Sequence, residues 1–397
     1  MTETGAVRQA DIWSLLRRAC RATFVGSALF LAACQGLVPR GPAPAPTPTE
    51  PGVVQPGLPT DTERHRVALL VPTSGPNAGV GQSIANATTL ALLDTGAKTV
   101  RITTYDTGKG AAAAAARAVA DGNRLILGPL TGDEVKIVSG PARKAGVPVI
   151  SFSNDNSVAG NGVFIMGYSP AQSVDRVVKF ARSKGMSSFA AIVPAGVYGE
   201  RTGSAMLQAV RDSGGTLVAM QNYDRSAASL AAAIKKLSET SGYEAVLIAD
   251  GGRIAIQAAP LLRKGSGANA RILGTELWNT EPGLTASESL RGAWFASVPD
   301  AYYRQLTTKY RARFGAAPYR LSALGYDAVL LTVRIAEGWR VGSPFPTGKL
   351  LDKGGFAGID GAFRFGRDGV AERALEVQQV GSGAFTVVDA APGGFGN

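Results

Sequence analysis

The sequence predicts an α/β protein built from two doubly wound, Rossmann-like lobes. Three observations lead to this prediction. Apolar runs of strand length, such as Val67 to Val71, are each followed by a loop of small residues and then by a segment with helical periodicity. This unit of strand, loop and helix recurs through two long stretches of the chain. A chain of 397 residues, 45% hydrophobic and 18% charged, is also long enough for two lobes with their own cores.

The first predicted lobe opens with the stretch from Arg66 to Gly81, in which an apolar strand runs into a loop rich in Gly and Pro. The elements that follow alternate regularly: helix 82–94, strand 100–105, helix 111–120, strand 124–127, helix 133–145 and strand 147–151. Repeated units of this kind favour a parallel sheet covered by helices, because crossovers between parallel strands are right-handed. Ligand sites in such sheets lie beyond the carboxyl ends of the strands, so the loops there should face one crevice.

A second series with the same alternation begins near Ser169. Its expected elements are helix 171–184, strand 188–193, helix 198–213, strand 216–223, helix 227–237, strand 245–249, helix 253–263 and strand 271–274. Two helices at 302–314 and 321–339 then interrupt the pattern before a hairpin-like region at 358–388. Helices at this point indicate that the chain returns to the first lobe, so several crossovers join the lobes. We expect lobe 1 at about 65–168 and 300–342, and lobe 2 at about 169–299 and 343–390.

The first 64 residues predict export and a tether. Three arginines, the last of them Arg21, precede an apolar stretch at 22–33 that is too short to span a bilayer but suits a signal peptide, here residues 1–33. The stretch ends in Leu-Ala-Ala-Cys34, which resembles the bacterial lipobox and implies lipidation of Cys34; an ordinary secretory signal is the alternative. By the same resemblance, Gln35 implies the periplasmic face of the outer membrane, with the inner membrane as the alternative. Residues 34–64 are Pro-rich and predict an extended tether.

The charge of +11 is concentrated after residue 64, where the chain carries +10. A basic body either keeps the protein soluble or attracts it to an anionic envelope surface or acidic partner. Nucleic acid is not expected as a partner, because no dense basic run carries interleaved aromatic residues. Both cysteines, Cys20 and Cys34, precede the globular part, and His65 is the only histidine. The sequence therefore predicts no disulfide within the globular part, no metal site and no cofactor.

Six motifs together resemble the type I periplasmic-binding-protein fold, and in particular its leucine-binding branch. They are ALLVPTSGPNAGVG at 68–81, ILGPL at 126–130, VPVISFS at 147–153, YGERTG at 198–203, GYDAV at 325–329 and FAGIDGAFRFGRDG at 356–369. Each motif alone is weak, but their order and spacing cover the whole stretch from about 65 to 390. The resemblance implies a two-lobed binding protein.

Two subgroups of that family compete. One is the amino-acid or amide receptor of an ABC importer, which would have a small amino-acid-like ligand and an ABC permease as its partners. The other is the penicillin-binding protein activator, an outer-membrane lipoprotein that stimulates peptidoglycan synthases. The lipobox with Gln35, the Pro-rich tether and the basic body look more like the activator. The sequence shows no counterpart of the N-terminal helical-repeat domain of the larger activators, which leaves the identity of the partner open.

No enzyme signature is present in the sequence. It contains no G-x-S-x-G, S-x-x-K, Walker A or C-x-x-C motif. The adjacent acids Asp133 and Glu134 fall at the start of a predicted helix, where the helix dipole explains them. We therefore expect a non-catalytic protein.

The resemblance to amino-acid receptors implies a set of ligand contacts. Donors to a ligand carboxylate would come from three loops, Tyr198 would close from the second lobe, and Glu276 would meet an ammonium group. The loop donors are Ser74, Gly75, Leu130, Thr131, Ser151, Ser153 and Asn154. The alternative is structural, because Ser and Thr at strand ends commonly cap helices.

The activator resemblance implies an exposed protein-binding surface. Its candidates are Tyr302, Tyr303, Arg304, Arg320, Trp339 and Arg340, since Arg, Tyr and Trp dominate interface hot spots. The alternative is that these residues lie on ordinary amphipathic helix faces.

Overall fold

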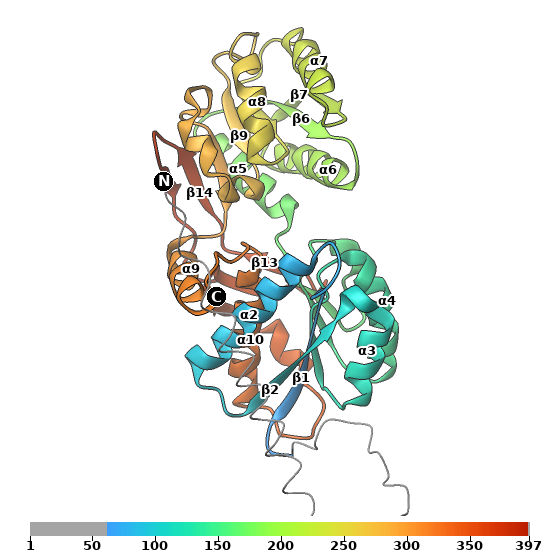
Figure 1. The fold of residues 1–397 in the computed structure, drawn as a ribbon. Helices are drawn as coiled ribbons and strands as arrows, with labels where there is room; N and C mark the ends of the chain where they lie inside the picture. The colour runs from blue at the N-terminus through green and yellow to red at the C-terminus, as the bar shows by residue number, and fades with distance from the viewer. Residues whose placement is uncertain (1–61, 396–397) are drawn as a thin grey trace, which may run out of the picture. The chain divides into compact units, whose positions relative to one another are not determined.

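The computed structural model describes residues 62–395 of the chain (Figure 1). The predicted signal peptide, the predicted lipidation site Cys34 and nearly all of the predicted tether lie outside these residues. Within the described part, no helix combines the length and the apolar character needed to cross a membrane.

A five-stranded sheet forms the first lobe, and all of its neighbouring strands are parallel. The strands lie in the order β2-β1-β3-β4-β5. Their bounds are β1 (His65–Val71), β2 (Val100–Asp106), β3 (Leu125–Leu127), β4 (Val149–Ser151) and β5 (Val163–Ile165). Helices α2 (Ala78–Thr95), α3 (Ala111–Ala120) and α4 (Gly132–Lys144) connect the strands. The reversal of strand order at β1 places the loops after β1 and β3 side by side at the carboxyl edge of the sheet.

A seven-stranded sheet forms the second lobe, in the order β15-β14-β10-β9-β8-β6-β7. The strands are β6 (Ser188–Pro194), β7 (Thr216–Tyr223), β8 (Ala245–Ile248), β9 (Arg271–Gly274), β10 (Trp294–Ser297), β14 (Glu376–Val380) and β15 (Phe385–Asp389). The helices are α5 (Pro170–Ser183), α6 (Val197–Asp212), α7 (Ala227–Ser238) and α8 (Gly252–Leu262). Strand β14 is antiparallel to β10, so the C-terminal hairpin extends an otherwise parallel sheet.

Each sheet is buried on both faces. On β1, Val67 and Leu69 pack into one apolar cluster, whereas Ala68 and Leu70 pack into another on the opposite face. This two-sided burial explains the unbroken apolar run in the sequence, since strands covered by helices on both sides need no polar face. On β6, Ile192 likewise packs into one apolar cluster, whereas Phe189 and Ala191 pack into another.

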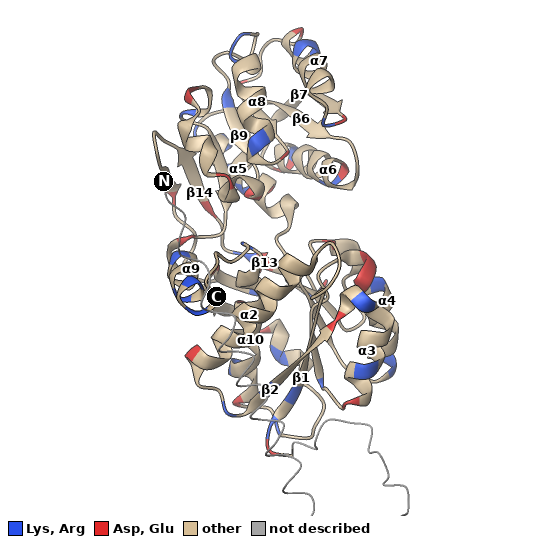
Figure 2. Ribbon diagram, viewed as in Figure 1, with Lys and Arg blue, Asp and Glu red and all other residues tan. Residues whose placement is uncertain are grey.

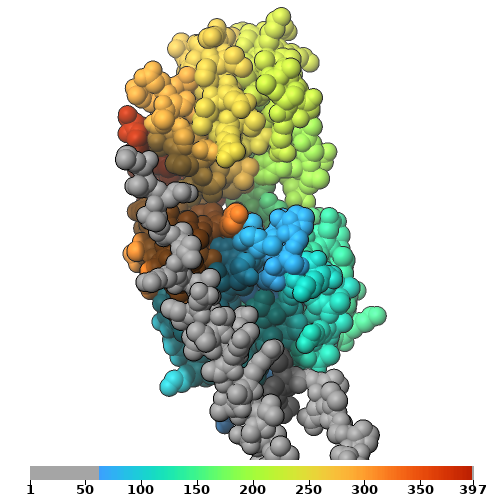
Figure 3. All heavy atoms as spheres, viewed as in Figure 1, coloured from blue at the N-terminus to red at the C-terminus, as the bar shows by residue number. Residues whose placement is uncertain are grey.

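The chain passes between the lobes three times. It leaves the first lobe after β5, returns after β10, and crosses again between β13 and β14. The returning segment adds α9 (Ala301–Phe314) and α10 (Ser322–Ala336), followed by a three-stranded antiparallel sheet of β11 (Phe356–Gly358), β12 (Gly361–Phe365) and β13 (Ala371–Arg373). Figure 3 shows early and late segments of the chain adjoining each other within this lobe.

The small sheet corrects the expected lobe boundary. The sequence-based expectation assigned 343–390 to lobe 2, but Phe356, Phe363 and Phe365 pack in one cluster with Val67 and Leu69 of β1. Of the strands within residues 343–390, only β14 and β15 join the seven-stranded sheet of the second lobe. Aromatic side chains on β11 and β12 complete the core of the first lobe. Their contact with β1 cannot be predicted from the spacing of the residues along the chain.

The predicted fold class is confirmed, and the predicted helices and strands match observed ones within a few residues. Two strands, β5 and β10, were not predicted. Short 3-10 helices were also absent from the prediction: η1 (Thr107–Lys109), η2 (Asn156–Val158), η3 (Glu276–Thr280), η4 (Pro282–Ala286), η5 (Glu288–Leu290) and η6 (Thr347–Leu351).

Candidate functional site

A cavity of about 410 Å³ lies at the carboxyl ends of the strands of both sheets. The first lobe contributes the loops after β1, β3 and β4, through Asn77, Leu130 and Asn154. The second lobe contributes Glu276 and the residues that follow it after β9. Cavities of about 300–1,000 Å³ with mostly apolar walls and a few polar groups are typical of small-molecule sites.

Glu276 is the acidic group of the second-lobe wall. The hydroxyl of Tyr198, on α6, lies 3.0 Å from Oε1 of Glu276 and 3.0 Å from Oγ1 of Thr275. The second oxygen, Oε2, is buried without a hydrogen-bond partner among the described residues. Burial raises the pKa of Glu276 to about 7, against the lowering effect of the Tyr198 hydrogen bond. Near neutral pH this carboxyl can therefore exist in either protonation state.

Trp278 fixes the position of the loop that carries Glu276. Its indole is fully buried, and Nε1 donates a 3.0 Å hydrogen bond to the carbonyl of Asp250 at the end of β8. The ring lies so close to Gly274 that a Cβ there would stand 2.2 Å from it. Glu276 is thereby held in the cavity lining.

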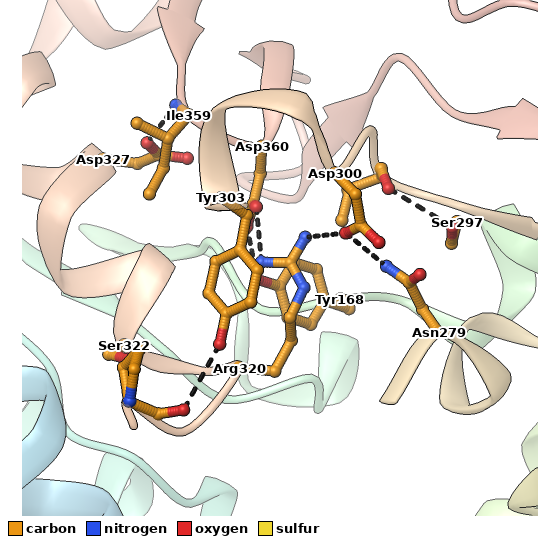
Figure 4. Close-up of polar contacts among 12 residues, drawn as sticks. Tyr168, Asn279, Ser297, Asp300, Tyr303, Arg320, Ser322, Asp327, Ile359 and Asp360 are labelled. Carbon is orange, nitrogen blue, oxygen red and sulfur yellow. Dashed lines mark hydrogen bonds and ion pairs between the residues drawn. The ribbon is translucent and has the colours of Figure 1, made fainter. Parts of the chain in front are cut away.

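A network of charged side chains lies at the base of the cavity (Figure 4). Nη1 of Arg320 lies 2.6 Å from Oδ1 of Asp360, whose other oxygen accepts a hydrogen bond from the hydroxyl of Tyr168. The guanidinium group of Arg320 also lies 4.0 Å from the ring centroid of Tyr303. Its Nη2 is 3.5 Å from Oδ1 of Asp300, at the second crossing. Burial lowers the pKa of Arg320, but the charge of Asp360 outweighs this and raises it, so the guanidinium stays charged.

Arg373 and Asp327 form a second buried pair beside this network. Nη1 of Arg373 lies 3.9 Å from Oδ2 of Asp327, and Nη2 donates a 2.8 Å hydrogen bond to the carbonyl of Met166. The backbone N–H of Ile359 donates to Oδ1 of Asp327 over 2.6 Å. Burial, and then the charge of Asp360, raise the pKa of Asp327. The two arginines are thus neutralised by the protein's own carboxylates, and this leaves Glu276 as the acidic group of the cavity wall with an unused oxygen.

Comparison with known families identifies the fold. A family model described as periplasmic binding protein matches residues 65–384. The chain belongs to the periplasmic binding protein family. The match confirms the type I, leucine-binding resemblance that the sequence motifs indicated.

Solved structures of several other proteins share this fold. A Rhodospirillum rubrum protein assigned to branched-chain amino acid ABC transport aligns with a TM-score of 0.72 and 20% identity over 82% of this chain and 100% of its own. Full-length LpoA from Haemophilus influenzae aligns with a TM-score of 0.65 and 21% identity over 83% of this chain and 60% of its own. An ABC transporter substrate-binding protein from Desulfitobacterium hafniense, in complex with Leu, aligns with a TM-score of 0.63 and 19% identity. The alignment covers 82% of this chain and 100% of that protein. At these identities the likeness shows the fold alone.

The uncharacterized protein RP748 from Rickettsia prowazekii is similar in sequence to part of this chain. It is 23% identical over 177 residues, which are 44% of this chain and 47% of that protein. The match thus spans about half the length of this relative.

Four of the predicted ligand-binding residues line the cavity of this periplasmic binding protein. They are Leu130, Thr131, Asn154 and Glu276. Tyr198 reaches the site indirectly, through its hydrogen bond to Glu276. The other four do not line the cavity: Ser74, Gly75, Ser151 and Ser153.

The predicted donors take part in hydrogen bonds within the protein, some of them to neighbouring loops. Ser151 donates from Oγ to the carbonyl of Pro129 over 2.9 Å, and Oγ of Ser153 accepts the N–H of Asp155. The N–H of Ser74 donates to Asp106 over 3.2 Å. Thr131 caps α4, and its hydroxyl and N–H both contact Glu134 at 3.1 Å. The structural alternative, helix capping, therefore describes Thr131, whereas Ser151 and Ser153 make other hydrogen bonds within the protein.

Sequence reasoning missed most of the charged network. Tyr168, Asp300 and Arg373 lie at the three crossings, so their spacing along the chain carries no signal of proximity. Arg320 was expected on the surface but is buried beneath the cavity. Trp339 was also expected on the surface and is only 5% exposed.

Tyr302, Arg304 and Arg340 are exposed, as a surface role requires. Within residues 62–395, no group of three or more His, Cys, Asp and Glu side chains could hold a metal ion.

Proposed function

We propose that this protein is a non-catalytic envelope lipoprotein that stimulates peptidoglycan synthesis through contacts with a penicillin-binding protein. One observation carries the proposal. The hydroxyl groups that an amino-acid receptor would offer to a ligand carboxylate are engaged inside the protein, at Ser151 and Thr131 above all. The two arginines at the base of the cavity are likewise paired with Asp360 and Asp327. The buried donors without a hydrogen-bond partner that the described cavity residues retain belong to these same arginines, Nε of Arg320 and Nε and Nη1 of Arg373, whose charges are already matched by carboxylates.

The N-terminal sequence supports an anchored activator. The lipobox-like Leu-Ala-Ala-Cys34 with Gln35 fits the periplasmic face of the outer membrane, and the Pro-rich stretch after it fits a spacer that extends the body toward a partner. The likeness to LpoA covers most of the described fold and agrees with this proposal, while the likeness to ABC substrate-binding proteins is equally strong.

The direct test is a synthase assay. The purified full chain is added to a bifunctional penicillin-binding protein from the same bacterium, and glycan polymerisation and crosslinking are both measured. We expect a several-fold rise in one of these rates and co-purification of the two proteins. Leu130→Trp, which fills the cavity, is the matched control and should stimulate like the wild type. An unchanged synthase, with no complex formed, would refute the proposal.

A small-molecule receptor is the second candidate, and the open cavity favours it. Its volume of about 410 Å³ suits a ligand of amino-acid or amide size, and the unpaired Oε2 of Glu276 can accept a hydrogen bond from an ammonium or amide group. Such a receptor would deliver its ligand to an ABC permease. Thermal unfolding in the presence of single amino acids and amides tests this function. A receptor should gain several degrees with one of them and lose that gain in Leu130→Trp.

A further inference from the structure

An ion pair joins the two lobes beside the ligand cavity, away from the three crossings. Nη2 of Arg201, on α6 of the second lobe, lies 2.6 Å from Oδ1 of Asp155, in the loop after β4 of the first lobe. The two side chains are 33% and 15% exposed, so water screens the pair only in part. The groove around the pair, of about 390 Å³, shares Asn154 and Ser169 with the ligand cavity. The pair therefore borders the cavity.

Asp155 is held in position by its own loop. The N–H of Ser157 donates to Oδ1 over 3.0 Å, and the Ser157 hydroxyl donates to the same oxygen over 2.6 Å. The N–H of Asp155 donates in turn to Oγ of Ser153 over 3.0 Å. Burial raises the pKa of Asp155, but the hydrogen bonds from Ser157 and Arg201 outweigh burial and lower it. The carboxylate is therefore charged and fixed at neutral pH.

The start of α4 supports the same carboxylate. A Cβ at Gly132 would stand 2.8 Å from Oδ2 of Asp155, so the glycine lets the carboxylate approach the first turn of the helix. The N-terminal end of a helix favours a negative charge. Asp155 is thus placed to meet a cation that comes from the second lobe.

Other charges near the pair cannot replace Arg201 as a link between the lobes. Lys136 interacts with the charges of both Asp155 and Arg201, but it belongs to the first lobe and pairs with Asp133 over 2.9 Å. Figure 2 shows acidic and basic residues close together at the end of α4 that faces the second lobe. Glu200, the exposed neighbour of Arg201 on α6, lines the same groove. Lys136 can neutralise Asp155, but it cannot tie one lobe to the other.

Helix α6 connects the pair to the wall of the cavity. Tyr198 lies three residues before Arg201, and residues at this spacing are neighbours on the surface of a helix. The Tyr198 hydroxyl lies 3.0 Å from Oε1 of Glu276. Tyr198 and Arg201 both belong to the YGERTG motif at 198–203. A movement of α6 away from the first lobe thus separates Arg201 from Asp155 and withdraws the wall that carries Glu276.

We propose that Arg201 and Asp155 form a latch that holds the two lobes together without a small-molecule ligand. Both lobes line the cavity, so a ligand enters and leaves it as the lobes separate. A latch that keeps most molecules closed lowers the apparent affinity of a ligand, because only the open fraction can admit it. It also gives the protein a constant shape, which reduces the cost of ordering when a protein partner binds. The inference goes beyond the proposed function, since it concerns the lobes whatever the partner is.

Distances between spin labels in the two lobes test the inference. The full chain carrying Cys20→Ser and Cys34→Ser is labelled at Lys144→Cys in the first lobe and Lys235→Cys in the second, both at exposed positions. Double electron–electron resonance then gives the distribution of distances. We expect one dominant distance in this parent chain. Arg201→Gln should raise the population at longer distances about fivefold, the upper range for a partly exposed ion pair.

A double-mutant cycle and a matched control make the test specific. Asp155→Asn should open the lobes as Arg201→Gln does, and the double variant should be no more open than either single variant, because all three lack the same contact. The control is Arg211→Gln, on the same helix, which removes a side chain that is 74% exposed and lies 3.8 Å from Asp212 of its own lobe. It should keep the distance distribution of the parent.

Thermal unfolding of each variant verifies the fold. Arg201→Lys, which retains the charge, is the fallback variant and should have an intermediate effect. A parent chain that already covers a broad range of distances would overturn the proposal. An Arg201→Gln distribution equal to that of the parent, or an equal change in Arg211→Gln, would overturn it as well. Stimulation of the synthase is measured separately and tests the proposed function independently of the latch.

Discussion

The hydroxyl of Tyr198 and one carboxylate oxygen of Glu276 are 3.0 Å apart, while the other oxygen of Glu276 has no hydrogen-bond partner among residues 62–395. The cavity wall therefore holds a carboxyl group that is half satisfied. A protonated Glu276 avoids a buried charge, whereas an ionised one needs a donor that the described protein does not supply. The protonation state of this residue should consequently report on both stability and ligand binding.

Glu276→Gln should change how stability depends on pH. Burial raises the folded-state pKa of Glu276 to about 7 from the ordinary glutamate value of 4.5, so the folded protein binds the proton more tightly. The resulting stabilisation is complete below the unfolded pKa and is lost as pH rises through 7. We expect the wild type to lose about 2 kcal/mol more than Glu276→Gln between pH 5 and pH 8.

Urea unfolding across that pH range measures the difference. Glu288→Gln, which alters a side chain that is 83% exposed, is the control and should follow the wild type. Parallel pH profiles for wild type and Glu276→Gln would contradict the prediction.

Arg320→Met should destabilise the first lobe strongly. The change removes the 2.6 Å partner of Asp360, which is fully buried, and leaves an uncompensated charge. Removing one member of such a pair costs about 3 kcal/mol or more. A double-mutant cycle with Asp360→Asn should recover part of the loss.

The exposed pair Arg253 and Glu281 is the control for that cycle. Its atoms lie 3.3 Å apart, but Arg253 is 89% exposed, so the coupling should be below about 0.5 kcal/mol. Equal coupling in the two cycles would show that burial does not govern the Arg320 pair.

Gly81→Ala should destabilise the protein by about 3 kcal/mol, because a Cβ at this helical position would stand 1.9 Å from the carbonyl oxygen of Pro72. Gly140, in α4, is the matched control: a Cβ there has nothing within 4 Å among the described atoms. Since alanine favours helices over glycine, Gly140→Ala should stabilise by about 0.5–1 kcal/mol. Guanidinium unfolding of both variants gives the comparison, and similar values for the two would rule out the close approach at Gly81.

Thr131→Ala should cost about 1 kcal/mol, because Thr131 caps α4 in a reciprocal arrangement with Glu134. Glu134→Gln preserves the capping pattern and should cost less. If Thr131 acts mainly as a cap, the synthase stimulation of Thr131→Ala should remain at the wild-type level. A loss of stimulation with unchanged stability would instead assign Thr131 to a binding surface.

Most of the fold could be predicted from the sequence because its signals are local. The apolar run in β1 and the periodicity of α3 each arise from neighbouring residues, and both elements were placed within two residues of their observed ends. Strands β5 and β10 escaped prediction for a physical reason. Val163–Ile165 follows β4 through η2, and Trp294–Ser297 follows β9 through short 3-10 helices. Neither strand is preceded by an α-helix, so both fall outside the alternation of strand and helix on which the prediction relied.

The site could be predicted only in part. Loops at the carboxyl ends of strands are identifiable from topology, which is why Leu130 and Asn154 were placed correctly near the cavity. Whether a hydroxyl faces a ligand or a neighbouring loop depends on geometry that spacing does not reveal, as the bond from Ser151 to Pro129 illustrates. Arg320 and Asp360 are 40 positions apart in the chain, so no local sequence pattern predicts that they form an ion pair.

The interleaved path of the chain has a consequence for how the molecule folds. The strands of the first sheet are synthesised before any of the second lobe, yet their core is closed by the returning segment. Leu324 and Phe363 of that segment follow about 260 and 300 residues after Val67. Strands β6 to β10 form an uninterrupted segment and can assemble without waiting for distant residues. The apolar face of the lobe that is made first thus stays uncovered until most of the chain has been synthesised. Folding should be slow for a chain of this size, and the exposed first sheet marks the stage most prone to aggregation.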